Sequence, residues 1–172
     1  HGALPGNESA APRVDLAFND ATASKMSYYL RFDTRVTAES CSANGVQELG
    51  ATLTLSQTIS PSDARALPPY VTGAVGFNSV VPGTQLVRVH VFAPAGGTLR
   101  DIKIDGSAVA MPKTVVLNER PAITLSVLIE SLDDVVVTFR MTTGEGQSDT
   151  GMVLETPGVL PGASSKKFDS AC

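Results

Sequence analysis

Residues 26–39 read MSYYLRFDTRVTAE. Apolar and polar side chains alternate along nearly the whole stretch, which is typical of a β-strand that is buried on one face only. The residues expected on the buried face are Met26, Tyr28, Leu30, Phe32, Thr34, Val36 and Ala38, with Thr34 the one polar residue among them. The residues expected on the exposed face are Ser27, Tyr29, Arg31, Asp33, Arg35, Thr37 and Glu39. This stretch predicts an antiparallel sheet with one face toward a core.

The same alternation recurs along the chain and predicts an all-β fold. Further strands are expected at 13–18, 49–59, 86–93, 102–104, 115–117, 123–129, 135–141 and 152–154. Asn44-Gly45 and Asp105-Gly106 are strong hairpin signals, because such turns need positive φ at both central residues. The loop 131–134 is predicted to join its two flanking strands as a third hairpin.

The expected architecture is an immunoglobulin-like, two-sheet antiparallel β-sandwich of about eight to ten strands with little helix. The proline-rich stretch 60–83 predicts a long crossover with one helical turn near 62–66. No βαβ alternation occurs, so no parallel pairing is expected. Residues 1–12 are expected to form an extended leader or linker and 13–172 a single domain, with the Lys166-Lys167 pair in a solvated tail.

Composition narrows the class of partner. The chain has 172 residues, a formal net charge of -4 and scattered basic residues, which argues against nucleic acid. No apolar run approaches the roughly 20 residues that a membrane helix needs. The first residues lack the charged and apolar regions of a signal peptide, so we expect any signal or membrane anchor to lie outside this sequence.

The two cysteines, Cys41 and Cys172, favour a disulfide bond. The alternatives are a metal pair or a reactive thiol, but two cysteines without a neighbouring histidine cannot complete a tetrahedral site. Because disulfides persist in oxidising compartments, the pairing predicts an exported, extracytoplasmic protein.

No catalytic constellation stands out, and we expect neither enzymatic activity nor a cofactor. His90 would have to serve any triad, yet it lies mid-strand among outward-facing residues. Asp133 and Asp134 are adjacent in a tight loop and are expected to diverge. Glu145 and Asp149 lie in a Gly-rich loop without the ligand spacing of a calcium site, so no metal is expected.

The candidate ligand or partner contact is Tyr29 with Arg31 and Arg35. Tyrosine and arginine on one exposed strand face can contact a sugar or a protein surface. The plainer alternative is a tyrosine on a half-covered sheet face. The chain has no tryptophan and only 5% aromatic residues, which weakens a sugar-binding interpretation.

Several segments carry a resemblance to a known family. They are NDATASKMSYYL at 19–30, LPPYVTG at 67–73, LVRV at 86–89, VLETPGV at 153–159 and the terminal Cys172. Together they resemble the C-terminal region of an actinobacterial family of membrane-anchored envelope proteins, domain of unknown function 4012. The resemblance implies an outward-facing module whose anchor and larger N-terminal region precede it, and it implies no catalytic residues.

Three functions remain open at this point. The first is a non-catalytic structural or interaction module of a cell-envelope protein. The second is a module that binds cell-wall glycan or another ligand through Tyr29, Arg31 and Arg35 or through the loop 60–83. The third is an accessory domain of an envelope enzyme whose active site lies outside this chain. The expected partner is an envelope protein or a glycan, with membrane attachment only through a segment outside this sequence.

Overall fold

The computed structural model describes residues 11–22, 24–73, 80–110, 113–156 and 164–172. Most of the predicted leader lies outside the described residues. The strands are β1 (Arg13–Asp20), β2 (Leu30–Cys41), β3 (Gln47–Gln57), β4 (Gln85–Phe92), β5 (Thr98–Ile104), β6 (Ser107–Ala108), β7 (Val115–Leu117), β8 (Arg120–Ile129), β9 (Asp134–Thr142), β10 (Gly151–Thr156) and β11 (Ser164–Phe168). The helical elements are the 3₁₀ turn η1 (Met26–Tyr29) and the short helices α1 (Pro61–Ala66) and α2 (Pro69–Thr72).

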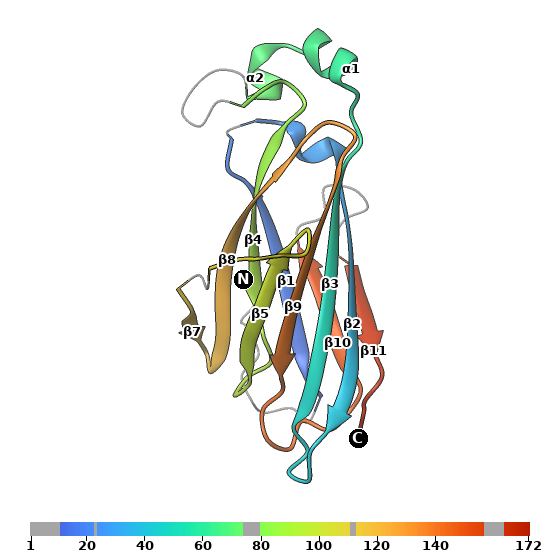
Figure 1. The fold of residues 1–172 in the computed structure, drawn as a ribbon, viewed down its shortest axis with the longest axis vertical. Coiled ribbons are helices and arrows are strands. Elements are labelled where there is room, and N and C mark those ends of the chain that lie inside the picture. Colours follow the sequence, from blue (N-terminus) through green and yellow to red (C-terminus); the bar gives the residue numbers. More distant parts are fainter. Residues whose placement is uncertain (1–10, 23, 74–79, 111–112, 157–163) are drawn as a thin grey trace.

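The strands form two sheets, which confirms the predicted all-β sandwich. Sheet A has the order β11-β10-β1-β4-β8-β7, and sheet B has the order β2-β3-β9-β5-β6. The long strands run along the long axis of the molecule, with α1 and α2 at one end and the β2–β3 turn and the C-terminus at the other (Figure 1). The immunoglobulin-like connectivity stays a prediction.

The core lies between the two sheets. Side chains such as Val89 and Leu125 from sheet A meet Leu53 and Phe139 from sheet B in one buried cluster. Successive side chains of a strand point to opposite faces, so each strand buries every second residue. The alternating pattern therefore located these strands correctly. Two predicted hairpins are confirmed, β2–β3 across Asn44-Gly45 and β5–β6 across Asp105-Gly106.

The predicted crossover between residues 60 and 83 is also confirmed. It carries the chain from β3 in sheet B to β4 in sheet A. Ser60 caps α1 by accepting a hydrogen bond from the Asp63 backbone N–H, and Pro61 begins the helix. Residues 80–84 return to β4 after a segment outside the described residues.

The predicted hairpin across residues 131–134 is wrong. β8 belongs to sheet A and β9 to sheet B, so the loop crosses between the sheets. Each strand has one buried stripe, and the two stripes face each other across the core instead of lying side by side. Alternation identifies the buried face of a strand but not the neighbour that completes its hydrogen bonds.

The expectation of a purely antiparallel fold is also wrong. β1 pairs with β10 in parallel, with Val14 opposite Val153, and with β4 in antiparallel. A βαβ unit joins two parallel strands that follow one another along the chain, whereas β1 and β10 are separated by most of the chain.

The C-terminal residues form an element that the sequence pattern did not predict. β11 pairs with β10, so Lys166 and Lys167 lie in a strand and not in a solvated tail. The Lys166 ammonium lies 2.7 Å from an Asp33 carboxylate oxygen and 3.4 Å from that of the buried Glu155. Lys166 therefore joins β11 of sheet A to β2 at the edge of sheet B.

A buried arginine ties sheet A together at β1, β4 and β8. Arg120 is 1% exposed and forms an ion pair with Asp15. Its guanidinium also donates to the carbonyl oxygens of Ala93 at 3.0 Å and Arg13 at 2.8 Å. A buried charge is tolerated when its hydrogen bonds are satisfied in this way.

Candidate functional site

An open groove lies on the outer face of sheet B. Its volume is about 1020 Å³, and its lining comes from β2, β3, β9, β5 and the β5–β6 hairpin. Most of the lining side chains come from the polar set of each strand, because the apolar set faces the core.

The strand register brings the groove side chains into rows that cross the sheet. Arg35 lies opposite Thr52, Thr52 opposite Thr138, and Thr138 opposite Lys103. This row therefore has a cation at each end and two threonine hydroxyls between them. Neighbouring strands lie about 4.8 Å apart, which places the backbones of the two end residues about 14 Å apart.

The adjacent row contains Thr37, Gly50, Arg140 and Arg100. Arg140 forms an ion pair with Glu39 of β2, so this carboxylate reaches over the middle of the sheet. A Cβ atom at Gly50 would lie 2.5 Å from the Glu39 Oε1 atom. The missing side chain at Gly50 thus gives the carboxylate its place in the groove floor.

Arg100 is held in the groove wall by two carboxylates. Its guanidinium nitrogens lie 2.6 Å from Glu48 Oε2 and 2.5 Å from Asp101 Oδ2. The hydrogen bond to Asp101 and the attraction of Glu48 raise the pKa of Arg100. The register of β5 against β9 shifts between Arg100 and Lys103, and Asp101 has a φ of 55°, so a bulge re-aims the side chains here.

The side chains that line the groove include more cations than carboxylates. Four cationic side chains and two carboxylates line the groove, whereas the formal net charge of the whole chain is -4. Arg100 and Arg140 are engaged in ion pairs with carboxylates. Arg35 reaches Asp33 only at 3.3 Å with 85% of its side chain exposed, and none of the ion pairs among the described residues contains Lys103. The two end cations of the threonine row are therefore the ones available to a ligand.

The structure does not bring Tyr29, Arg31 and Arg35 together. Residues 26–29 form η1 instead of continuing β2, and this turn changes which side chains are exposed. Tyr29 is half-buried against the small cluster of Met26, Ile59 and Ala64, while the neighbouring Tyr28 is 55% exposed. The expected exposure of Tyr29 is therefore wrong.

Arg31 and Arg35 have different surroundings. The Arg31 guanidinium donates to the carbonyl oxygens of Tyr28 and Leu30, each at 2.9 Å, and thereby closes the end of η1. Arg35 alone of the three residues lines the groove. Whether any of the three contacts a ligand stays a prediction.

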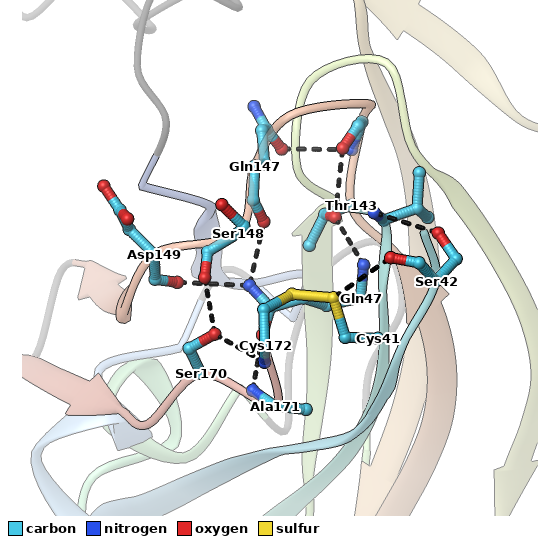
Figure 2. The surroundings of a disulfide bond; sticks show 12 residues. Cys41, Ser42, Gln47, Thr143, Gln147, Ser148, Asp149, Ser170, Ala171 and Cys172 are labelled. Carbon is cyan, nitrogen blue, oxygen red and sulfur yellow. Dashed lines mark hydrogen bonds between the residues drawn. A yellow bond between two sulfur atoms is a disulfide. The ribbon is translucent and has the colours of Figure 1, made fainter. Parts of the chain in front are cut away.

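The predicted disulfide between Cys41 and Cys172 is confirmed, with Cα atoms 5.1 Å apart. Gln47 holds the same end of the chain through its side-chain amide. Its Oε1 atom accepts from the Ala171 N–H at 2.9 Å, and its Nε2 donates to the Gln147 carbonyl at 2.8 Å (Figure 2). The C-terminus is thus fastened beside the β2–β3 turn.

The other titratable candidates lie apart from the groove. His90 is on the outer face of sheet A, where its Nδ1 atom lies 2.9 Å from the Thr124 hydroxyl. The side chain of Asp133 accepts from the Asp134 N–H, and Glu145 accepts from the Asn44 side chain at 3.3 Å. Within the described residues, no group of three His, Cys, Asp or Glu side chains is placed to hold a metal ion.

A second exposed surface is the edge of sheet A. Val115, Val116 and Leu117 of β7 are 44%, 67% and 47% exposed. A three-residue apolar edge strand presents unpaired backbone groups to solvent. None of the helices in the described ranges combines the length and apolar character that a membrane span requires.

Sequence reasoning missed most of the groove. Glu39 and Thr37 were placed on the correct face of their strand, but Arg100, Lys103 and Arg140 had no distinguishing signal. These residues lie on β5 and β9, and only the strand order brings them beside β2 and β3.

Comparison with known proteins gives no family. No family model matches the chain, and no curated protein matches it. Among solved structures, the chain is similar to a Legionella pneumophila protein described as a "putative nutrient binding protein", with 9% sequence identity and a TM-score of 0.42. The match covers 86% of this chain and 55% of that protein, so this chain spans about half of its length. At this level of similarity the match carries no functional argument, and the resemblance to domain of unknown function 4012 stays a prediction.

Proposed function

We propose that this chain is a non-catalytic, extracytoplasmic module that binds a glycan in the groove on the outer face of sheet B. The observation that carries the proposal is the groove itself, which combines a concave surface with hydroxyl groups and charged side chains from four neighbouring strands. Ligand sites are concave and contain a few convergent polar groups that fix the orientation of the ligand. The polar floor suits a polyhydroxylated ligand better than an apolar one.

The non-catalytic part of the proposal rests on the state of the groove carboxylates. Glu39 and Asp101 are each paired with an arginine, Arg140 and Arg100 respectively. A hydrolytic site needs one carboxyl group free to donate a proton and a second free to attack or to activate water. Carboxylates fixed in ion pairs are suited to orienting a ligand.

The extracytoplasmic location is supported by the disulfide, because such bonds are rare where thiols are kept reduced. The resemblance to the envelope family points the same way. On this proposal the chain is the outward-facing part of a longer envelope protein whose anchor precedes it.

The test is a glycan-array screen of the oxidised protein with a groove-filling variant. Thr52→Trp places a large side chain in the middle of the groove, and strands accommodate tryptophan well. Ser126→Trp makes the matched change on the exposed face of β8 in sheet A. We expect wild type and Ser126→Trp to bind the same glycans and Thr52→Trp to lose them. Absence of any bound glycan, or binding that survives Thr52→Trp, would overturn the proposal.

A structural or interaction module is the second candidate, and the apolar edge strand β7 favours it. Chemical cross-linking in intact envelopes would compare wild type with Val116→Lys on β7 and with Val81→Lys, another exposed valine outside the strands. A cross-linked partner lost only in Val116→Lys would support this candidate. Equal cross-linking in all three proteins would contradict it.

A further inference from the structure

We infer that the ligand of the groove is an anionic glycan, a linear chain with carboxylate or phosphate groups. It lies across β2, β3, β9 and β5, with anionic groups at Arg35 and Lys103. The inference rests on the proposed function and adds the chemical class of the ligand.

The first support is the sign of the groove charge. Its lining has more cationic than anionic side chains on a chain whose overall charge is negative. If the cations served only to balance the acidic residues of the chain, they could be spread over the whole surface. Their presence together on one sheet face therefore needs another reason. Exposed cations on a concave surface raise the local concentration of anions, and Arg35 and Lys103 are the two lining cations whose charge is least compensated.

The second support is the arrangement of available donors. Arg35 and Lys103 lie at the two ends of the row that also contains Thr52 and Thr138. A chain laid along this row meets a cation, two hydroxyls and a second cation in order. The hydroxyls can donate to or accept from sugar hydroxyl groups, and the cations can form charge-assisted hydrogen bonds with acidic groups.

The third support is the fixed charge beside this row. Arg100 and Arg140 are held by Glu48, Asp101 and Glu39. These ion pairs form a groove wall that contains both charges. A ligand with anionic groups on every side would be repelled by the carboxylates of this wall. Spaced acidic groups along one side of a chain fit this pattern better than dense negative charge.

The fourth support is the lack of an aromatic platform in the described groove lining. Phe139 is the aromatic residue among the lining residues, and it is 1% exposed. Neutral glycans and single-stranded nucleic acids gain much of their affinity by stacking on exposed aromatic rings. In this groove, charge and hydrogen bonding must supply the affinity.

The test measures binding of the full, oxidised chain to four probes by calorimetry. Oligogalacturonate supplies carboxylates, poly(glycerol phosphate) supplies phosphodiesters, a dextran oligomer is neutral, and oligothymidylate represents nucleic acid. The variant Arg35→Gln/Lys103→Gln removes both end cations. The matched variant Arg88→Gln/Lys167→Gln removes two exposed cations from sheet A.

We expect at least one of the two anionic glycan probes to bind, and the preferred one identifies the acidic group. Loss of a charge-assisted hydrogen bond weakens binding about tenfold, so the groove variant should bind about 100-fold more weakly. The matched variant should stay within about twofold of wild type. Binding should weaken as salt rises, because exposed charges are screened.

Other outcomes overturn the inference and separate it from the proposed function. Binding of dextran that is lost in Thr52→Trp but unchanged in Arg35→Gln/Lys103→Gln would leave the groove function intact and reject the anionic class. Tighter binding of oligothymidylate than of either anionic glycan would reject the glycan class. Anionic binding reduced equally by both double variants would show non-specific attraction and reject the assigned row.

Discussion

Removal of the Cys41–Cys172 disulfide should cause a large loss of stability that acts mainly through the unfolded chain. The two residues are 131 positions apart, so the bond closes most of the sequence into one loop. In the chain-entropy model, a loop of this size stabilises the folded state by about 5 kcal/mol. The double variant Cys41→Ser/Cys172→Ser is therefore expected to lower the free energy of unfolding by about that amount.

The native contacts around the bond should remain in this variant. The hydrogen bonds from Ala171 to Gln47 and from Ser170 to the Ser148 carbonyl do not involve the sulfur atoms. The folded C-terminus therefore keeps its position, and the loss arises from the greater freedom of the unfolded chain.

Equilibrium urea unfolding followed by circular dichroism measures this effect. With an m-value of about 2–3 kcal/mol/M, the midpoint should fall by about 2 M. Wild type treated with a reductant should unfold at the same midpoint as the double variant. A loss below about 1 kcal/mol, or a reduced wild type that differs from the variant, would refute the entropic account.

Urea unfolding also tests three further substitutions, at Arg120, Asp33 and Gly97, whose contacts hold the fold together. Arg120→Met should cost about 3–5 kcal/mol because the buried Asp15 carboxylate loses its ion pair with Arg120 and is left with the partly exposed Arg13 as its partner, and Arg120→Met combined with Asp15→Leu should recover much of the loss. The hydrogen bond from Lys166 lowers the pKa of Asp33 below its ordinary value of 3.8. The stabilisation is thus present above that pH and lost as the pH falls through the lowered pKa, and Asp33→Asn should flatten stability below about pH 4. Gly97→Ala should cost about 1–3 kcal/mol, because its Cβ atom would lie 2.0 Å from a backbone carbonyl oxygen of β9.

The features that the sequence predicted best are those that depend on a single strand or turn. The buried stripes of β3, β4, β8 and β9 follow the alternation because each of these strands has one face on the core. The β2–β3 turn was predictable for a similarly local reason, since Gly45 has a φ of 72°. Local pattern and local backbone geometry were sufficient for these features.

The errors concern relations between strands. The loop between Glu130 and Asp134 has the length of a hairpin loop, yet Leu132 has a φ of 58° and the chain passes to the other sheet. Either arrangement satisfies the same alternation, because both bury the same side chains. Similarly, Tyr28 and Tyr29 fit a strand as well as a 3₁₀ turn, and only the turn explains why Tyr28 is exposed.

The groove was not predictable, because its chemistry arises from strand order and register. Arg35 and Lys103 are separated by 68 positions in the chain numbering and become ends of one row only when β3 and β9 lie between their strands. A shift of β3 or β9 by one residue against its neighbours would turn Thr52 or Thr138 toward the core. A composition with few aromatic residues weakened the glycan interpretation, but it did not exclude a site that uses charge.

β2 takes part both in the contacts that hold the fold together and in the proposed site. β2 is an edge strand of sheet B, and it supplies Arg35, the outermost cation of the groove. An edge strand frays readily, because only one of its sides is hydrogen-bonded. Here Lys166 binds Asp33 beside Arg35, and the disulfide fixes Cys41 at the far end of the strand. The ion pair and the disulfide that join β2 to the rest of the fold therefore also keep this edge of the groove in register. The backbone that carries Arg35 is held in place before a ligand binds.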